Sequence, residues 1–117
     1  MCGLAGLAGA ADRRIVEAMT RALAHRGPDS EGYFVSQDPP LALGHRRLAI
    51  IDIAGGHQPM WNEDGRVAVI FNGEIYNHVE LRAELARMGH TFASDHSDTE
   101  VLVHGWEQWG EALPEKL

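Results

Sequence analysis

Residues 66–77 read RVAVIFNGEIYN, an apolar run that ends in a polar turn. Residues 67–71 are all apolar, which is typical of a short strand covered on both faces, so we predict a buried strand over 66–72. Asn72-Gly73 closes this strand. The Asn side-chain amide and the following backbone N–H can donate to an oxyanion, and glycine permits close approach. The same dipeptide is also a common hairpin turn, and by itself it favours the turn.

Upstream of this strand, the sequence predicts three further strands and one helix. Apolar runs indicate a buried strand over 2–8 and strand-like segments over 33–35 and 41–51. A helix is expected over 13–24, with Asp12 as its N-cap. The apolar face predicted for this helix consists of Ile15, Met19, Ala22 and Leu23.

Downstream, two more helices are expected, which makes the fold class α+β. One runs over 78–88, with Asn77 as N-cap and Gly89 as its stop. The other runs from a capping box at Ser97 to Gly110, and no final element is recognisable after it. The expected faces are Leu81, Leu85 and Met88 for the first helix and Leu102, Trp106 and Trp109 for the second.

Composition limits the class of protein. The 117 residues suit one small domain, and 44% hydrophobic with 23% charged residues is typical of a soluble globular protein. The net charge of -7 disfavours nucleic acid as a partner. A single cysteine excludes an internal disulfide, and no signal or membrane segment is recognisable, so we expect no membrane association and a cytoplasmic location.

That cysteine, Cys2, follows the initiator methionine. Methionine is generally removed before a small residue, and Cys2 would then carry its own α-amino group beside the thiol. Such an amine can accept the thiol proton, which activates the sulfur as a nucleophile. An incidental small residue in a strand is the plainer interpretation, and position alone favours it.

Arg47 and Asp98 complement the two charged ends of a free amino acid. Arginine binds a carboxylate with two parallel hydrogen bonds, and aspartate pairs with an ammonium group. A charged residue on an exposed strand explains Arg47 equally well. An acid at the start of a helix is favourable in itself, which explains Asp98 without any ligand.

The seven histidines do not suggest a metal site. The candidate ligand pairs are His90 with His96 and His45 with His57. Neither pair has the helical spacing with a supporting acid that zinc motifs show, and no cysteine pair accompanies them. We therefore predict that the chain binds no metal.

Five short motifs occur in order along the whole chain. Together they resemble the glutaminase domain of the class II glutamine amidotransferases, most closely the branch found in glutamine-hydrolysing asparagine synthetases. Each motif is weak alone, whereas five in order with similar spacing are specific. They are Met1-Cys2-Gly3, His25-Arg26-Gly27-Pro28-Asp29, Arg47-Leu48-Ala49-Ile50-Ile51-Asp52, Asn72-Gly73-Glu74-Ile75-Tyr76-Asn77 and Ser97-Asp98-Thr99-Glu100-Val101.

The resemblance implies an N-terminal nucleophile hydrolase fold, an αββα sandwich of two antiparallel sheets, of which residues 1–117 would be the N-terminal portion. It implies that Cys2 attacks the amide of glutamine through a thioester intermediate, and that the turn over 25–29 supports the pocket. The implied oxyanion site is Asn72 with the Gly73 N–H. The implied substrate-binding residues are Arg47, Leu48, Ile50, Asn72, Gly73, Glu74 and Asp98.

Relatives of this kind also carry an ATP-using synthetase domain with a pyrophosphate loop, and Ala54-Gly55-Gly56-His57 is not such a loop. We therefore expect no cofactor in this chain, with ATP and Mg²⁺ acting only in a synthetase domain, in cis or in trans, that makes asparagine. Three alternatives stay open: another amidotransferase branch serving amino-sugar or purine synthesis, an amide synthetase for a peptide or antibiotic product, and a catalytically silent interaction module. A homodimer is also left open.

Overall fold

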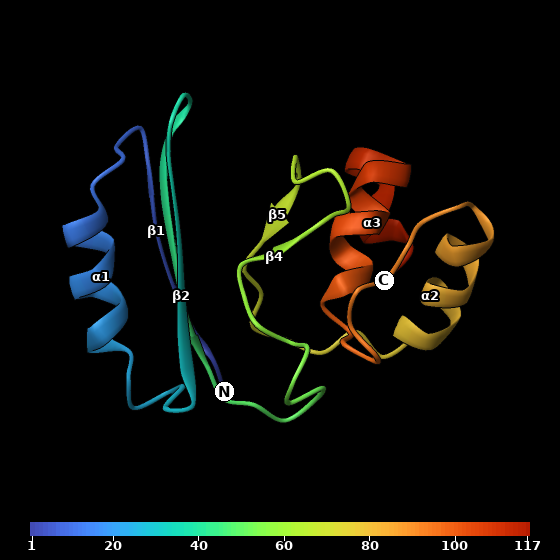
Figure 1. Cartoon of the computed structure of the whole chain (residues 1–117), viewed down its shortest axis with the longest axis horizontal. Coiled ribbons are helices and arrows are strands. Elements are labelled where there is room, and N and C mark those ends of the chain that lie inside the picture. The colour runs from blue at the N-terminus through green and yellow to red at the C-terminus, as the bar shows by residue number, and fades with distance from the viewer. The chain divides into compact units, whose positions relative to one another are not determined.

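The computed structural model describes all 117 residues and has an α+β fold with antiparallel sheets, as predicted (Figure 1). The chain divides into two units, which are described separately below. No helix combines the length and the apolar character needed to cross a lipid bilayer. Unit 1 comprises Met1–Ile50, His57–Pro59 and Ile70–Asn72, and unit 2 comprises Ile51–Gly56, Met60–Val69 and Gly73–Leu117.

Unit 1 is a three-stranded antiparallel sheet with one helix packed on it. The strand order is β1-β3-β2, with β1 at Gly3–Ala8, β2 at Ser30–Gln37 and β3 at Pro40–Arg47. Figure 1 shows helix α1, Arg13–Ala22, lying along one face of this sheet. The residues of β1 alternate between buried and exposed from Gly3 to Gly6, so this strand is not buried throughout as predicted.

Helix α1 begins where predicted, because the Asp12 carboxylate accepts the N–H groups of Arg14 and Ile15 at 2.9 and 3.2 Å. Its predicted apolar face is wrong for Ile15, Met19 and Ala22, which are exposed, whereas Leu23 packs against the core of unit 1 as predicted. Ile15 is 49% exposed, whereas Val16 and Thr20 are fully buried.

A threonine can occupy the buried face because its hydroxyl is satisfied within the helix. Thr20 Oγ1 donates to the Val16 carbonyl at 2.7 Å. The sheet provides space at the same point, since a Cβ on Gly44 would lie 2.1 Å from Thr20 Oγ1. Glycine in β3 therefore lets the helix approach closely.

The strand predicted over 66–72 is much shorter than expected. Only β5, Ala68–Val69, forms a ladder, and its antiparallel partner in unit 2 is β4, Met60–Trp61. Residues 67–71 are half-buried, so the prediction of a fully covered strand is wrong. The strand expected over 41–51 likewise ends at Arg47.

Unit 2 is built on two helices that are close to the predicted ones. They are α2, His78–Arg87, and α3, Glu100–Trp109, and Figure 1 shows α3 between α2 and the β4–β5 hairpin. Glycines with positive φ follow both helices, as predicted, at Gly89 and Gly110.

Asn77 occupies the predicted N-cap position of α2, but its side-chain amide donates to the Lys116 carbonyl at 2.7 Å and makes no cap hydrogen bond. The capping box predicted at Ser97 is wrong, because α3 starts at Glu100 with Thr99 at its N-cap position.

The predicted faces hold for Leu81, Leu85 and Leu102, which are buried, whereas Met88 and Trp106 are each 48% exposed. Helix α3 buries all of residues 100–105 rather than a single stripe. A final element does exist, the 3₁₀ helix η1 at Gly110–Glu115, whose Leu113 packs closely on α3.

Candidate active site

Cys2 lies against the backbone at the end of β3 in unit 1. The Leu48 N–H donates to Cys2 Sγ at 3.4 Å, and the thiol faces the Leu48 carbonyl at 3.8 Å. Antiparallel pairing of Gly3 with Arg46 produces this arrangement, because it aligns the start of β1 with the end of β3. The backbone at the end of β3 therefore fixes the position of the sulfur.

The turn over residues 26–29 holds the same strand end in place. Arg26 Nε donates to the Cys2 carbonyl at 3.0 Å. The Asp29 carboxylate accepts the Ala49 N–H at 2.7 Å, and the Asp29 N–H donates to the Arg47 carbonyl at 3.0 Å. The turn is therefore joined by hydrogen bonds to the backbone of Cys2, Arg47 and Ala49.

Gly27 is the point of closest approach between this turn and β3. A Cβ at Gly27 would lie 2.4 Å from the carbonyl carbon and oxygen of Arg46 and 2.7 Å from the Arg47 nitrogen. Arg46 Nε donates to the Gly27 carbonyl at 2.8 Å and fixes the contact. Only glycine allows the two backbones to meet at this distance.

Three predicted substrate-binding residues follow one another at this strand end. Arg47 is the last residue of β3 and is only 5% exposed, so the interpretation of an exposed strand charge is wrong. Leu48 is half-buried, and Ile50 is 66% exposed. The guanidinium of Arg47 is thus in a buried residue three positions before the exposed Ile50, and a guanidinium can bind a carboxylate with two parallel hydrogen bonds.

Asn72 also belongs to unit 1. The backbone of the preceding residue, Phe71, is hydrogen-bonded by two side chains and not by a neighbouring strand. His45 Nε2–H donates to the Phe71 carbonyl at 3.2 Å, and the Phe71 N–H donates to Gln58 Oε1 at 2.6 Å. Asn72-Gly73 is not a hairpin turn, since no strand follows it. The role of His45 was missed from the sequence, because the Phe71 contact spans 26 positions.

His45 is a buried histidine of unit 1 with a lowered pKa. It is 1% exposed, and burial lowers its pKa from 6.5, with the charge of Arg47 acting in the same direction and the Phe71 hydrogen bond opposing them. The neutral imidazole therefore persists at neutral pH and donates its one N–H to the Phe71 carbonyl.

Unit 2 brings together the other predicted residues, Gly73, Glu74 and Asp98. Asp98 is 6% exposed, and its carboxylate accepts the Ile75 N–H at 2.9 Å, which ties it to the loop that carries Gly73 and Glu74. Helix α3 starts after Asp98 and has no side-chain cap, so Asp98 does not serve as one. Glu74 is exposed beside it.

Residues 52–56 of unit 2 form a turn that the Asp52 carboxylate holds together. Asp52 has a φ of 45°, and its carboxylate accepts the N–H groups of Gly55 and His96 at 2.8 and 3.3 Å. Burial acts to raise the Asp52 pKa, but these hydrogen bonds outweigh it and hold the pKa below 3.8. The Gly55-Gly56 pair is thus part of a turn organised by a carboxylate, which does not suit a phosphate.

The structure also groups four side chains with metal-ligand chemistry in unit 2, which the sequence analysis missed. Glu63, His90, His104 and Glu107 each offer one ligand atom, and all of these atoms lie within 4.8 Å of one another. Of the four histidines that the sequence analysis weighed and rejected as metal ligands, only His90 belongs to this group. The only local signal was His104 with Glu107, three residues apart on one face of α3.

Comparison with known proteins identifies what the chain is similar to. A family model described as "Glutamine amidotransferase domain" matches residues 1–117. "Asparagine synthetase [glutamine-hydrolyzing] 1" of Bacillus subtilis is 46% identical, with 100% of this chain and 19% of the relative covered. "Asparagine synthetase [glutamine-hydrolyzing]" of Sandersonia aurantiaca is 48% identical, with 97% and 22% covered. "Asparagine synthetase [glutamine-hydrolyzing] 2" of Oryza sativa subsp. japonica is 46% identical, with 100% and 20% covered. The chain thus spans about a fifth of these relatives.

Proposed function

The chain belongs to the glutamine amidotransferase domain family, and from this premise we propose that it hydrolyses the side-chain amide of glutamine with Cys2 as the nucleophile. The family match and the relatives confirm the resemblance drawn from the five motifs. The observation that carries the proposal is the position of the Cys2 sulfur, 3.4 Å from the Leu48 N–H. Leu48 in turn directly follows the buried Arg47.

The first step requires a base for the thiol proton. Met1 is 71% exposed and therefore accessible for removal, after which the α-amine of Cys2 accepts that proton. An electron pair of the sulfur then forms a bond to the amide carbon of glutamine, and the π electron pair of the C=O bond moves onto the carbonyl oxygen. Collapse of this intermediate returns the proton to the leaving nitrogen, so that ammonia departs and a γ-glutamyl thioester remains. Water hydrolyses the thioester to glutamate and regenerates the thiol.

The intermediate carries an oxyanion, for which we assign Asn72 and the Gly73 N–H as donors. His45 and Gln58 support this assignment, because they fix both backbone groups of Phe71, the residue before Asn72. A donor that is held in place before the reaction needs no reorganisation as charge develops.

Recognition of glutamine is assigned to charged groups at its α-carbon. Arg47 binds the α-carboxylate, helped by backbone groups near Leu48 and Ile50, while Asp98 and Glu74 bind the α-ammonium. The burial of Arg47 and Asp98 supports the assignment, because water competes poorly for a charge pair in such surroundings.

For the whole protein, we propose the sequence of events expected from its relatives. Residues 1–117 form the N-terminal portion of a glutaminase domain with an αββα sandwich, and a synthetase domain in cis or in trans uses the ammonia to convert aspartate to asparagine. ATP and Mg²⁺ act in that synthetase domain, and the glutamine reaction itself needs no cofactor. Nucleic acid and membranes are not proposed as partners.

Glutamate and ammonia release from glutamine by the purified protein tests the proposal. The Cys2→Ala variant should lose this release by at least about 1,000-fold, because no nucleophile remains. Arg47→Gln should raise the KM for glutamine, whereas Arg66→Gln, an exposed arginine of unit 2, serves as the matched control. Unchanged glutaminase activity in Cys2→Ala would refute the assignment.

A further inference from the structure

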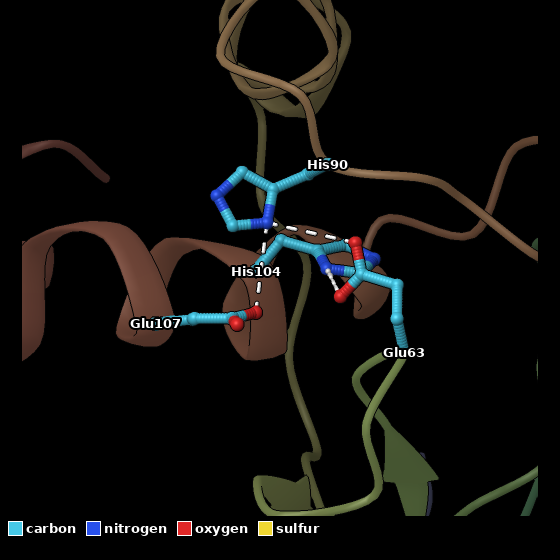
Figure 2. A group of neighbouring side chains, drawn as sticks. All are labelled: Glu63, His90, His104 and Glu107. Carbon is cyan, nitrogen blue, oxygen red and sulfur yellow. Dashed lines mark ion pairs between the residues drawn. The ribbon is translucent and has the colours of Figure 1, made fainter.

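Unit 2 contains a second chemical constellation that the glutamine reaction does not use. Figure 2 shows Glu63, His90, His104 and Glu107 pointing toward one another. Glu63 comes from the loop between β4 and β5, and His90 follows α2. His104 and Glu107 lie on α3. Three segments that are distant in sequence thus converge on one point.

The separations between the ligand atoms suit a small cation. His90 Nδ1 is 3.6 Å from a Glu63 oxygen and 3.6 Å from a Glu107 oxygen, and His104 Nδ1 is 3.2 Å from the other Glu63 oxygen. Tetrahedral zinc, with bonds of about 2.0–2.2 Å, places its ligands roughly 3.4 Å apart.

Each histidine is oriented by a contact on its far nitrogen. His90 Nε2 lies 3.2 Å from Gln108 Oε1, and His104 Nε2 lies 3.4 Å from Glu100 Oε1. With the proton on Nε2, each Nδ1 presents a lone pair to the cluster. Histidine ligands in metal sites are oriented in this way.

The two carboxylates are held in a comparable manner. Glu63 accepts the Thr91 N–H at 2.7 Å, and Glu107 accepts the Asn62 amide at 3.2 Å. All four ligand side chains therefore have a polar contact from outside the cluster that fixes their direction.

His104 directs a buried ring nitrogen at this group. Its side chain is 1% exposed, and its Nδ1 has no hydrogen-bond partner. Glu63 Oε2 is 3.2 Å away, yet it is not placed to accept a hydrogen bond from the ring. A buried nitrogen without a hydrogen-bond partner is unfavourable, and a metal ion would use its lone pair.

We propose that Glu63, His90, His104 and Glu107 bind one Zn²⁺ ion. Two carboxylates and two neutral imidazoles neutralise the charge of a divalent ion. Two nitrogen ligands favour zinc over Mg²⁺ or Ca²⁺, which prefer oxygen. Because the protein supplies four ligands, the site is structural and joins the β4–β5 loop, the segment after α2, and α3.

Zinc binding to the purified, chelator-treated protein tests this proposal. We expect the Cys2→Ser variant to bind one equivalent of zinc with micromolar affinity or better. This variant lacks the only cysteine of the chain, so no thiol can contribute to the binding. Mg²⁺ at the same concentration should not compete. Cobalt in place of zinc should give a tetrahedral visible spectrum without a sulfur-to-metal band. Failure of the protein to retain zinc, or loss of the bound zinc in Cys2→Ser, would overturn the site.

Variants with matched controls locate the ion. His90→Gln and Glu107→Gln should each weaken zinc binding by roughly 100-fold or more and remove the rise in Tm that zinc causes. The exposed residues His57 and Glu111 provide the controls His57→Gln and Glu111→Gln, which should bind as the parent does. Circular dichroism verifies that each variant is folded. Zinc affinity that stays unchanged in both ligand variants would refute the assignment.

Discussion

Replacing Gly27 with alanine should destabilise unit 1 and impair the nucleophile together. The new methyl would lie 2.4 Å from the Arg46 carbonyl, about 1 Å closer than an ordinary contact allows. The obstacle is backbone, which cannot rotate away as a side chain can. The end of β3 must therefore shift, although pairing of Arg46 with Gly3 holds it in register.

The magnitude follows from two contributions. Overpacking against a fixed backbone typically costs about 1–3 kcal/mol. Separating the two backbones also removes the hydrogen bond from Arg46 to the Gly27 carbonyl, worth about 1 kcal/mol. The expected loss in the free energy of unfolding is therefore about 2–4 kcal/mol. Because Leu48 follows this strand end and contacts Cys2, kcat/KM for glutamine should fall more than the unfolded fraction explains.

Urea denaturation and glutaminase assays on the same samples measure both effects. Gly6→Ala is the matched control, because its new methyl would be 3.4 Å from a flexible Leu43 side chain. It should leave stability within about 0.5 kcal/mol or raise it, since alanine suits a strand better than glycine. A loss below about 0.5 kcal/mol in Gly27→Ala would refute the argument from close backbone approach.

Three further predictions concern individual side chains. Arg26→Gln removes the hydrogen bond to the Cys2 carbonyl and should lower kcat for glutamine hydrolysis about 10-fold or more, with little change in Tm because Arg26 is exposed. Asp98→Asn should raise the KM for glutamine at least about 10-fold, as expected for a lost charged contact, whereas the exposed Asp95→Asn should not. Burial lowers the pKa of His45 from 6.5, so its protonation favours the unfolded state, and stability should fall as the pH drops below 6.5 toward the folded pKa.

Each of these predictions has an outcome that would contradict it. A kcat for Arg26→Gln equal to that of the parent would show that the Cys2 carbonyl needs no support. Equal loss of thermal stability and glutamine binding in Asp98→Asn would indicate that Asp98 only anchors the Ile75 N–H. For His45, urea midpoints measured between pH 5 and 8 should lose part of their pH dependence in His45→Gln, and identical profiles would remove His45 as the cause.

Local signals in the sequence predicted the helices well and their environment poorly. The helix capped by Asp12 was found because a cap involves neighbouring residues. Its buried face was not, because the hydroxyl of Thr20 is satisfied inside the helix and leaves a threonine free to pack. The prediction of a long strand over 66–72 was wrong for a related reason. Side chains of His45 and Gln58 bind the Phe71 backbone, and periodicity carries no information about such partners.

In the candidate site, too, the sequence indicated individual residues but not their long-range contacts. Motifs indicated Cys2, Arg47 and Asp98 as functional residues, yet nothing in them specified that the Leu48 backbone would face the sulfur. That contact depends on the register between β1 and β3. The four-residue metal cluster was missed because its ligands come from three segments, and long-range convergence leaves no local pattern.

Trapping of the covalent intermediate tests the central claim most directly. The purified protein is incubated with glutamine and acid-quenched, and the peptide that begins at Cys2 is analysed by mass spectrometry; hydroxylamine is then added to release γ-glutamyl hydroxamate. We predict a γ-glutamyl group on Cys2 in a chain that has lost Met1, and no adduct in Cys2→Ala. Glutamine hydrolysis without an adduct on Cys2, or by a chain that retains Met1, would contradict the account.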